Sequence, residues 1–300
     1  MGLFDKIKKK EEVFQQDTNQ IAEHPGMVFV VHLLMEEMCE MPEKENMHAT
    51  MCKHLGEVDC FCHDGKIAGF AAKKYMVHFE KDNIDAPAQL MITNCVKIEK
   101  PVMDDISRSQ LWDCQCGDEL LDTCKYQVIA TDMLAAGLDY KERAEMLVDY
   151  IEALVELYPT CRAVVFETSK KMFTREDIIN CKMPKESRFI YYAVNVRFFN
   201  IQGTDDMIVD SLGMSTLFLP DLQYHFNGMD PNEVVNHAYN VLSYIYDNNN
   251  PIQNGDHIDG IVDGKMSQDI QWNVQYENSL IQPIREVIDI NMREYAAGNR

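Results

Sequence analysis

The clearest pattern of hydrophobic and polar positions in the chain follows Asp230. Asp230 can cap a helix, Pro231 fits a first helical position, and Glu233 can reach back in a capping box. Residues 248–251, Asn-Asn-Asn-Pro, are typical of a helix end. Between these signals, apolar residues recur at helical spacing and predict one buried face: Val234, Val235, Ala238, Val241, Leu242 and Ile245.

Segments rich in β-branched and aromatic residues precede this helix. They predict strands over 189–199, 207–212 and 217–226, and a sheet on which the helix packs. After the helix, alternation predicts a strand over 270–276. We further expect a final helix over 284–295 and disorder from Ala296 onward.

The first half of the chain predicts a strand-rich α+β pattern. Asp64-Gly65 is typical of a hairpin turn between two of these strands. Asp139 and Glu142 can cap a long amphipathic helix that Pro159 ends. The expected strands are 27–35, 58–62, 67–73, 76–79, 89–98, 126–133 and 162–167, and the expected short helices are 43–54, 106–112, 118–124 and 173–180.

A chain of 300 residues is long for one hydrophobic core, so we expect two modules. We place a flexible leader at 1–24, one module at 25–125 and a second at 126–300. The predicted fold class is α+β: two sandwiches of mainly antiparallel sheet, each with helices packed on one face. Leu3, Phe4 and Ile7 with four nearby lysines also allow a surface-lying amphipathic anchor inside the leader, instead of a solvated one.

Composition and charge narrow the classes of partner. The formal net charge of −21 disfavours nucleic acid and anionic lipid. No apolar run approaches the length of a membrane span, and no secretory signal is evident. Ten cysteines without such a signal are typical of reduced thiols in the cytoplasm, which is the localisation we expect.

Several segments resemble one known family. They are the strand-like RFIYYAVNVRFF, an acidic-apolar strand ending at Gly213, LFLPDLQYHF around Asp221, the helix opening DPNEVV, and NGDHIDG at 254–260. In these features the chain resembles the uncharacterised bacterial proteins grouped under domain of unknown function 4261. The likeness extends upstream to Trp112, the strand entry Lys125-Tyr126 and AVVF, about two-thirds of the chain. It implies a shared fold and a bacterial cytosolic setting, and it implies no activity.

Motifs for metal binding and catalysis are sparse. Two Cys-x-Cys pairs, Cys60 with Cys62 and Cys114 with Cys116, are candidate zinc ligands, because residues two apart on a strand face the same side. Their alternative role is as ordinary thiols, so no cofactor is predicted and zinc stays an open alternative. Nucleophile-elbow, phosphate-loop and dinucleotide motifs are missing from the sequence, which disfavours an enzyme without excluding one.

Asp221 and His225 are the candidate binding residues, because both lie in the segment with the strongest family likeness. The alternative for Asp221 is a turn aspartate that binds local backbone N–H groups, and for His225 a histidine satisfied in the core. The leading functional hypothesis is a protein-binding or accessory protein, such as a toxin-neutralising one, that uses an acidic surface for a basic partner. The alternative is an enzyme or small-ligand binder with a cleft between the modules. Reaction, partner and oligomeric state stay open.

Overall fold

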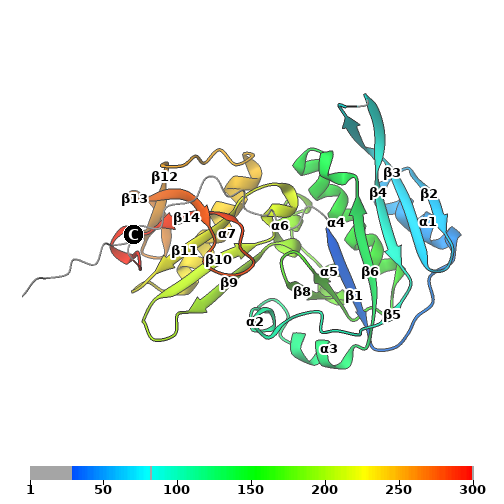
Figure 1. Ribbon diagram of the computed structural model, residues 1–300, viewed down its shortest axis with the longest axis horizontal. Coiled ribbons are helices and arrows are strands. Elements are labelled where there is room, and N and C mark those ends of the chain that lie inside the picture. The colour runs from blue at the N-terminus through cyan, green and yellow to red at the C-terminus, as the bar shows by residue number, and fades with distance from the viewer. Residues whose placement is uncertain (1–28, 82, 299–300) are drawn as a thin grey trace, which may run out of the picture.

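The computed structural model describes residues 29–81 and 83–298, which form two mostly antiparallel sheets (Figure 1). The expected leader 1–24, including its anchor alternative, lies outside the described residues. The strands of the first sheet are β1 (Val30–Met35), β2 (Val58–His63), β3 (Ile67–Phe79), β4 (Ile84–Thr93), β5 (Val96–Lys97), β6 (Tyr126–Met133), β7 (Ala163–Phe166) and β8 (Lys171–Thr174).

The first sheet has the order β2-β3-β4-β6-β1-β7-β8, and β5 pairs with β6. All of these pairs are antiparallel. The expected hairpin turn is present: Asp64 Oδ1 accepts hydrogen bonds from the N–H groups of Lys66 and Ile67, both at 2.9 Å. The strands expected at 67–73 and 76–79 are one strand, β3, with a register shift between Ala72 and Met76 in its pairing with β4.

The second sheet has the order β12-β13-β14-β11-β10-β9, and only its β11–β14 pair is parallel. Its central strands are buried on both faces, as expected for a sheet covered by other elements. The strands are β9 (Asn195–Asn200), β10 (Met207–Leu212), β11 (Asp221–Phe226), β12 (His257–Val262), β13 (Lys265–Asn278) and β14 (Glu286–Asn291).

Helices cover both sheets. The α-helices are α1 (Lys44–Leu55), α2 (Asp105–Arg108), α3 (Gly117–Thr123), α4 (Tyr140–Leu157), α5 (Arg175–Ile179), α6 (Arg188–Ala193) and α7 (Pro231–Asp247). Short 3₁₀ segments are η1 (Ala135–Gly137), η2 (Lys185–Ser187), η3 (Met214–Leu217) and η4 (Arg293–Tyr295). The α+β class with mainly antiparallel sheets is confirmed.

The first sheet carries helices on both faces. Leu33 and Met35 of β1 join the main core with α1 and α4, whereas Leu34, between them, joins a second cluster with Leu120 of α3. Neighbouring residues of a strand point to opposite faces, so α3 covers the face opposite α4. One main core continues across both sheets, and Figure 1 shows α6 between them.

The long helix α7 begins and ends where its sequence predicts. The Asp230 carboxylate accepts the Asn232 N–H at 2.9 Å, and Pro231 occupies the first turn. The expected capping box is not formed, because Glu233 lies beside Gly264 in the β12–β13 turn instead. The apolar face packs on the second sheet and is fully buried except for half-buried Val235: Val234, Ala238, Val241, Leu242 and Ile245.

Two expectations about secondary structure were wrong. The first half of the strand expected at 189–199 is helix α6, which packs against α4 and β8 and buries Phe189, Ile190 and Tyr192. The final helix expected at 284–295 is strand β14, which lies between β13 and β11. In both cases tertiary packing overrides local preference.

Smaller differences follow the same rule. The helix expected at 173–180 begins as strand β8, paired with β7, and becomes α5 only after Thr174 and Asp177 form a capping box. The disorder expected from Ala296 is not found at its first residues, because the Ala297 N–H donates to the His225 carbonyl at 2.9 Å.

Strand β6, which we placed in the second module, pairs with β1 in the first sheet. The sheets therefore divide the chain between β8 and β9 rather than at residue 125.

Candidate functional site

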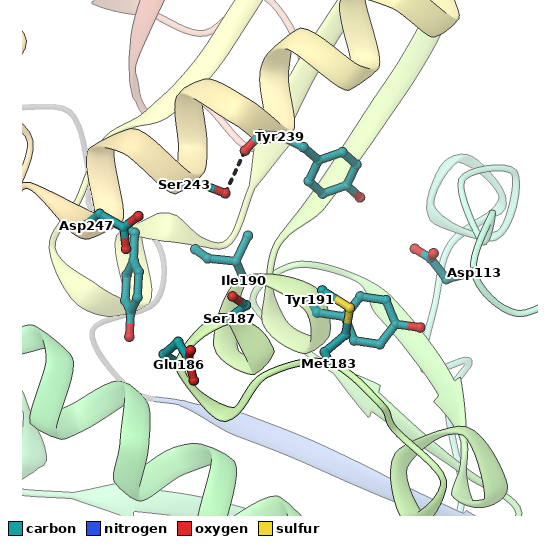
Figure 2. A pocket seen from close by; sticks show the side chains of 10 residues that line it. Asp113, Met183, Glu186, Ser187, Ile190, Tyr191, Tyr239, Ser243 and Asp247 are labelled. Atoms are coloured by element: carbon teal, nitrogen blue, oxygen red, sulfur yellow. Dashed lines mark hydrogen bonds between the residues drawn. The ribbon is translucent and has the colours of Figure 1, made fainter.

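A pocket of about 390 Å³ opens between α6, α7 and the loop that precedes α3 (Figure 2). Helix α6 and strands β7 and β8 associate with the first sheet, whereas α7 covers the second, so the pocket lies where the two sheets meet. The residues that line it are Asp113, Met183, Glu186, Ser187, Ile190, Tyr191, Tyr239, Ser243, Tyr246 and Asp247.

Helix α7 supplies one wall through the face opposite its buried stripe. Tyr239, Ser243 and Asp247 are four residues apart, so they lie one above another on the helix surface. The Ser243 hydroxyl donates to the Tyr239 carbonyl at 2.9 Å, and Figure 2 shows both residues facing the pocket. One helix therefore serves the core with one face and the pocket with the other.

The middle of the pocket is apolar. Ile190 of α6 is 6% exposed and lies between the two ends of the pocket in Figure 2. Met183, from the turn before α6, adds a flexible thioether side chain. This surface favours a ligand with a hydrocarbon portion.

One end of the pocket holds a buried lysine behind its lining. Lys171 of β8 is 2% exposed, and its Nζ lies 3.1 Å from Asp113 Oδ2 and donates to the Val194 carbonyl at 3.0 Å. Three aromatic rings surround the ammonium, with centroids 5.3 Å (Phe173), 5.5 Å (Tyr191) and 5.7 Å (Tyr239) from Nζ. Aromatic faces attract cations, so this is an internal cation–π cage.

Two features of the surroundings of Lys171 change its pKa in opposite directions. Burial lowers the pKa of the amine, while the carboxylate of Asp113 raises it, and burial is the larger effect. The same contacts also bind four separate elements together: β8, α6, α7 and the loop before α3. Asp113 is therefore committed to Lys171 and adds little free negative charge to the pocket.

The other end of the pocket carries two carboxylates that form no ion pair among the described residues. Glu186 and Asp247 are exposed, and within residues 29–81 and 83–298 neither has an ion-pair partner. Tyr246 lies beside them, and burial raises the pKa of its phenol to about 12, so it is a neutral hydrogen-bonding group at pH 7. Lys141 approaches from α4, where its Nζ donates to the Asp247 carbonyl at 2.9 Å and lies 5.9 Å from the Tyr246 ring centroid.

The predicted binding residue Asp221 lies in the core, away from the pocket lining. It is 1% exposed at the start of β11 and accepts the Ser211 hydroxyl at 2.8 Å and Arg285 Nε at 3.2 Å. Arg285 Nη2 also donates to Asp210 at 2.9 Å, and Asp210 accepts two hydrogen bonds from Arg197. Two aspartates and two arginines thus form one buried, charge-balanced network across β9, β10, β11 and the residue before β14.

The backbone around Asp221 matches the local role that we held as its alternative. The N–H groups of Met214 and Gly213 point at its carboxylate at 3.3 and 3.4 Å. Burial raises the pKa of Asp221, and Arg285 and Ser211 oppose that rise. The second candidate, His225, is half-buried on β11, with Nε2 3.5 Å from Asp206 Oδ2.

Most of this network, except for Arg197, lies in a segment that matches a sequence family. Residues 210–291 match the family model described as Domain of unknown function (DUF4261). This part of the chain is similar to the DUF4261 family. The match runs from Asp210 to Asn291 and so includes both aspartates of the network, Arg285 and the whole of α7. No curated protein and no solved structure matches the chain.

The DUF4261 segment contributes only one wall of the pocket. Tyr239, Ser243, Tyr246 and Asp247 come from α7, whereas the other lining residues lie before residue 192, outside the match. The resemblance that we found upstream, from Trp112 to AVVF, is not part of the matched segment. The pocket therefore depends on how the family segment packs against the rest of this chain.

The cysteine pairs do not assemble into one set of four ligands. Cys60 packs against the main core, whereas Cys114 lies in the cluster on the other face of the first sheet. Cys60 and Cys62 are also separated by a register shift in the β2–β3 pairing, which breaks their common orientation. Across residues 29–81 and 83–298, no group of three or more His, Cys, Asp or Glu side chains is arranged to hold a metal.

In the same part of the chain, no helix is long and apolar enough to cross a membrane.

The pocket residues were missed in the sequence because they form no contiguous motif. They come from the loop before α3, the turn before α6, α6 itself and α7, which meet only after folding. One signal was available: the outer face of α7 carries Tyr239, Tyr246 and Asp247 where a solvated helix face is usually rich in lysine and glutamate.

Proposed function

We propose that this protein is a non-enzymatic binding protein whose acidic surface recognises a positively charged partner protein. The observation that supports the proposal is the location of the charge imbalance. Among the described residues, four cationic and six acidic side chains are buried, so buried charges nearly balance. Most of the excess of acidic over basic side chains in the described residues therefore lies outside the buried set, where it attracts basic partners at long range.

The proposal also includes a cellular location. All ten cysteines are free thiols, which fits the reducing cytoplasm, and we expect the protein to act there. A role as an accessory or toxin-neutralising protein is consistent with binding of this kind, because such proteins act by covering a charged surface of the partner.

Binding to a defined basic probe tests this proposal. We expect a fluorescent peptide of ten arginines to bind at low salt and to lose affinity steeply as salt is added, because salt screens exposed charges. A matched peptide of ten aspartates is the control and should not bind. Absence of arginine-peptide binding at low salt would remove the support for a basic partner.

A second candidate function has one observation in its favour. The pocket volume of about 390 Å³ lies within the range of small-molecule sites, and the pocket lies between the two sheets. A small-ligand binder or an enzyme would use this pocket as its site. Thermal-shift screening with neutral and anionic metabolites distinguishes the candidates, since a stabilising anionic ligand would favour this second function.

A further inference from the structure

We propose that the pocket between α6 and α7 receives one basic side chain, lysine or arginine, of the partner protein. This inference rests on the proposed function and adds the chemistry of a specific contact site. A basic side chain combines a hydrocarbon stem with a cationic head. The pocket offers a surface for each part, in a fixed order along its length.

The apolar middle of the pocket fits the stem. Ile190 and Met183 provide this surface, and Ile190 lies between Asp113 and Asp247 in Figure 2. A ligand that reaches across Ile190 therefore has one terminus near each end of the pocket.

The two ends differ in the charge that they accept. At the Asp113 end, the negative charge is already paired with Lys171, and the ammonium of Lys171 repels a second cation. At the opposite end, Glu186 and Asp247 have no ion-pair partner within the described ranges, and Tyr246 adds an aromatic surface. The head of the incoming side chain is therefore directed to the Glu186 and Asp247 end.

The chain already contains an example of the same recognition. Phe173, Tyr191 and Tyr239 hold the ammonium of Lys171 through their ring faces. Tyr191 and Tyr239 also line the pocket, so the internal lysine shapes its wall and excludes the incoming cation from that end. This arrangement gives the pocket a direction as well as a charge preference.

Two lysines, Lys141 and Lys185, lie near the accepting end. Lys185 is paired with Asp149 at 2.6 Å, so Lys141 is the cation whose position competes with the ligand. It contacts the Asp247 carbonyl and the rings of Tyr140 and Tyr246. Because Lys141 is exposed and flexible, an incoming cation can displace it from the Tyr246 ring. Replacement by an uncharged residue should therefore strengthen binding.

The test compares two short peptides, acetyl-Gly-Arg-Gly-amide and the same peptide with citrulline, the uncharged isostere of arginine. Binding is followed by NMR through the methyl signals of Ile190 and Met183. We expect the arginine peptide to shift both signals and the citrulline peptide to bind at least about fivefold more weakly, because only the former carries a cation. Equal binding of the two peptides, or shifts that avoid both methyl groups, would overturn the inference.

Charge-neutralising variants locate the head of the ligand. The double variant Glu186→Gln/Asp247→Asn should weaken arginine-peptide binding about tenfold, because it removes two exposed charge contacts with the arginine. A matched control, Glu119→Gln/Asp205→Asn, removes the same charge from exposed positions elsewhere and should change binding less than about twofold. Lys141→Gln should raise affinity. Equal losses in the two double variants would show general charge attraction and would refute a specific pocket.

The arginine decamer separates failure of this inference from failure of the proposed function. If the decamer binds both double variants equally while the tripeptide does not reach the pocket, the pocket inference fails and the acidic-surface proposal stands. If the decamer does not bind the wild-type protein at low salt, the proposed function itself fails.

Discussion

Asp221 is the residue whose replacement tests most directly how the buried network supports the fold. In the wild type, Asp210 and Asp221 balance Arg197 and Arg285, and all four residues are at most 3% exposed. Asp221→Asn preserves size and removes one negative charge. Arg285 is then left to share Asp210 with Arg197, and the core gains an uncompensated positive charge.

The expected cost follows from the burial of that charge. Removing one partner of a buried ion pair typically destabilises a protein by about 3–5 kcal/mol. The N–H groups of Met214 and Gly213 point at different oxygens of the carboxylate, so the asparagine NH2 group would face one of these two donors. We therefore expect a loss toward the upper part of that range, a large fraction of a typical total stability of about 5–15 kcal/mol.

Urea unfolding monitored by tryptophan fluorescence measures this loss. Trp272 is 1% exposed on β13 of the same sheet and reports on its unfolding. Asp205→Asn is the matched control, since Asp205 is exposed and its replacement should change stability by less than about 0.5 kcal/mol. In a double-mutant cycle, Arg285→Met combined with Asp221→Asn should cost about 1–3 kcal/mol less than the sum of the single changes.

A change of less than about 1 kcal/mol in Asp221→Asn, with an unchanged denaturant slope, would refute this reasoning. It would mean that Asp221 is dispensable for the fold, and its role as a ligand-binding residue would then have to be reconsidered.

Two further predictions concern residues that adjoin the same sheet, His237 on α7 and Gly213 after β10. The His237 ring is hydrogen-bonded to the Tyr224 hydroxyl at 2.9 Å and to the Asp259 backbone carbonyl at 2.7 Å. Burial lowers the pKa of His237 below its ordinary value of 6.5. The unfolded chain therefore binds the proton more readily than the folded one. The free energy of unfolding should thus fall as pH drops below about 6.5, and it should fall by less in His237→Gln than in the wild type. An equal drop in the urea midpoint of the wild type and the variant between about pH 7.5 and about pH 5.5 would contradict this. Gly213 has φ +130°, and an added Cβ would lie 2.2 Å from the Ala193 carbonyl oxygen. Gly213→Ala should therefore lower the free energy of urea unfolding by about 3 kcal/mol or more. Gly203→Ala is the control and should lower it by about 1 kcal/mol, because no atom lies near the added Cβ. Similar losses in the two variants would show that the contact with Ala193 relaxes easily.

The local signals in the sequence were sufficient for elements whose ends and faces are chemically marked. Helix α7 has a capping aspartate, a first-turn proline and a stripe of apolar residues, and it forms as expected. Helix α4 and the Asp64-Gly65 hairpin are also marked in this way and were confirmed. These features depend on residues within one or two turns of each other, so the chain determines them without its tertiary partners.

Other segments depended on partners far away in the chain. The run Arg188–Ala193 is rich in aromatic and branched residues and reads as strand, but packing against α4 and β8 makes it a helix. Strand β14 reads as a helix and is held instead by β13 on one side and β11 on the other. A short apolar segment fits either element, and its neighbours decide which one forms.

The sequence by itself determined the α+β class, the marked helices, the family likeness and an excess of negative charge. Only the tertiary structure decided what that chemistry serves. It buried Asp221 in a balanced network, placed Cys60 and Cys114 on opposite faces of one sheet, and brought Asp113, Ile190 and Asp247 around a single pocket. The physical reason is that burial, charge pairing and pocket shape arise from contacts between residues distant in sequence, and no local pattern encodes those contacts.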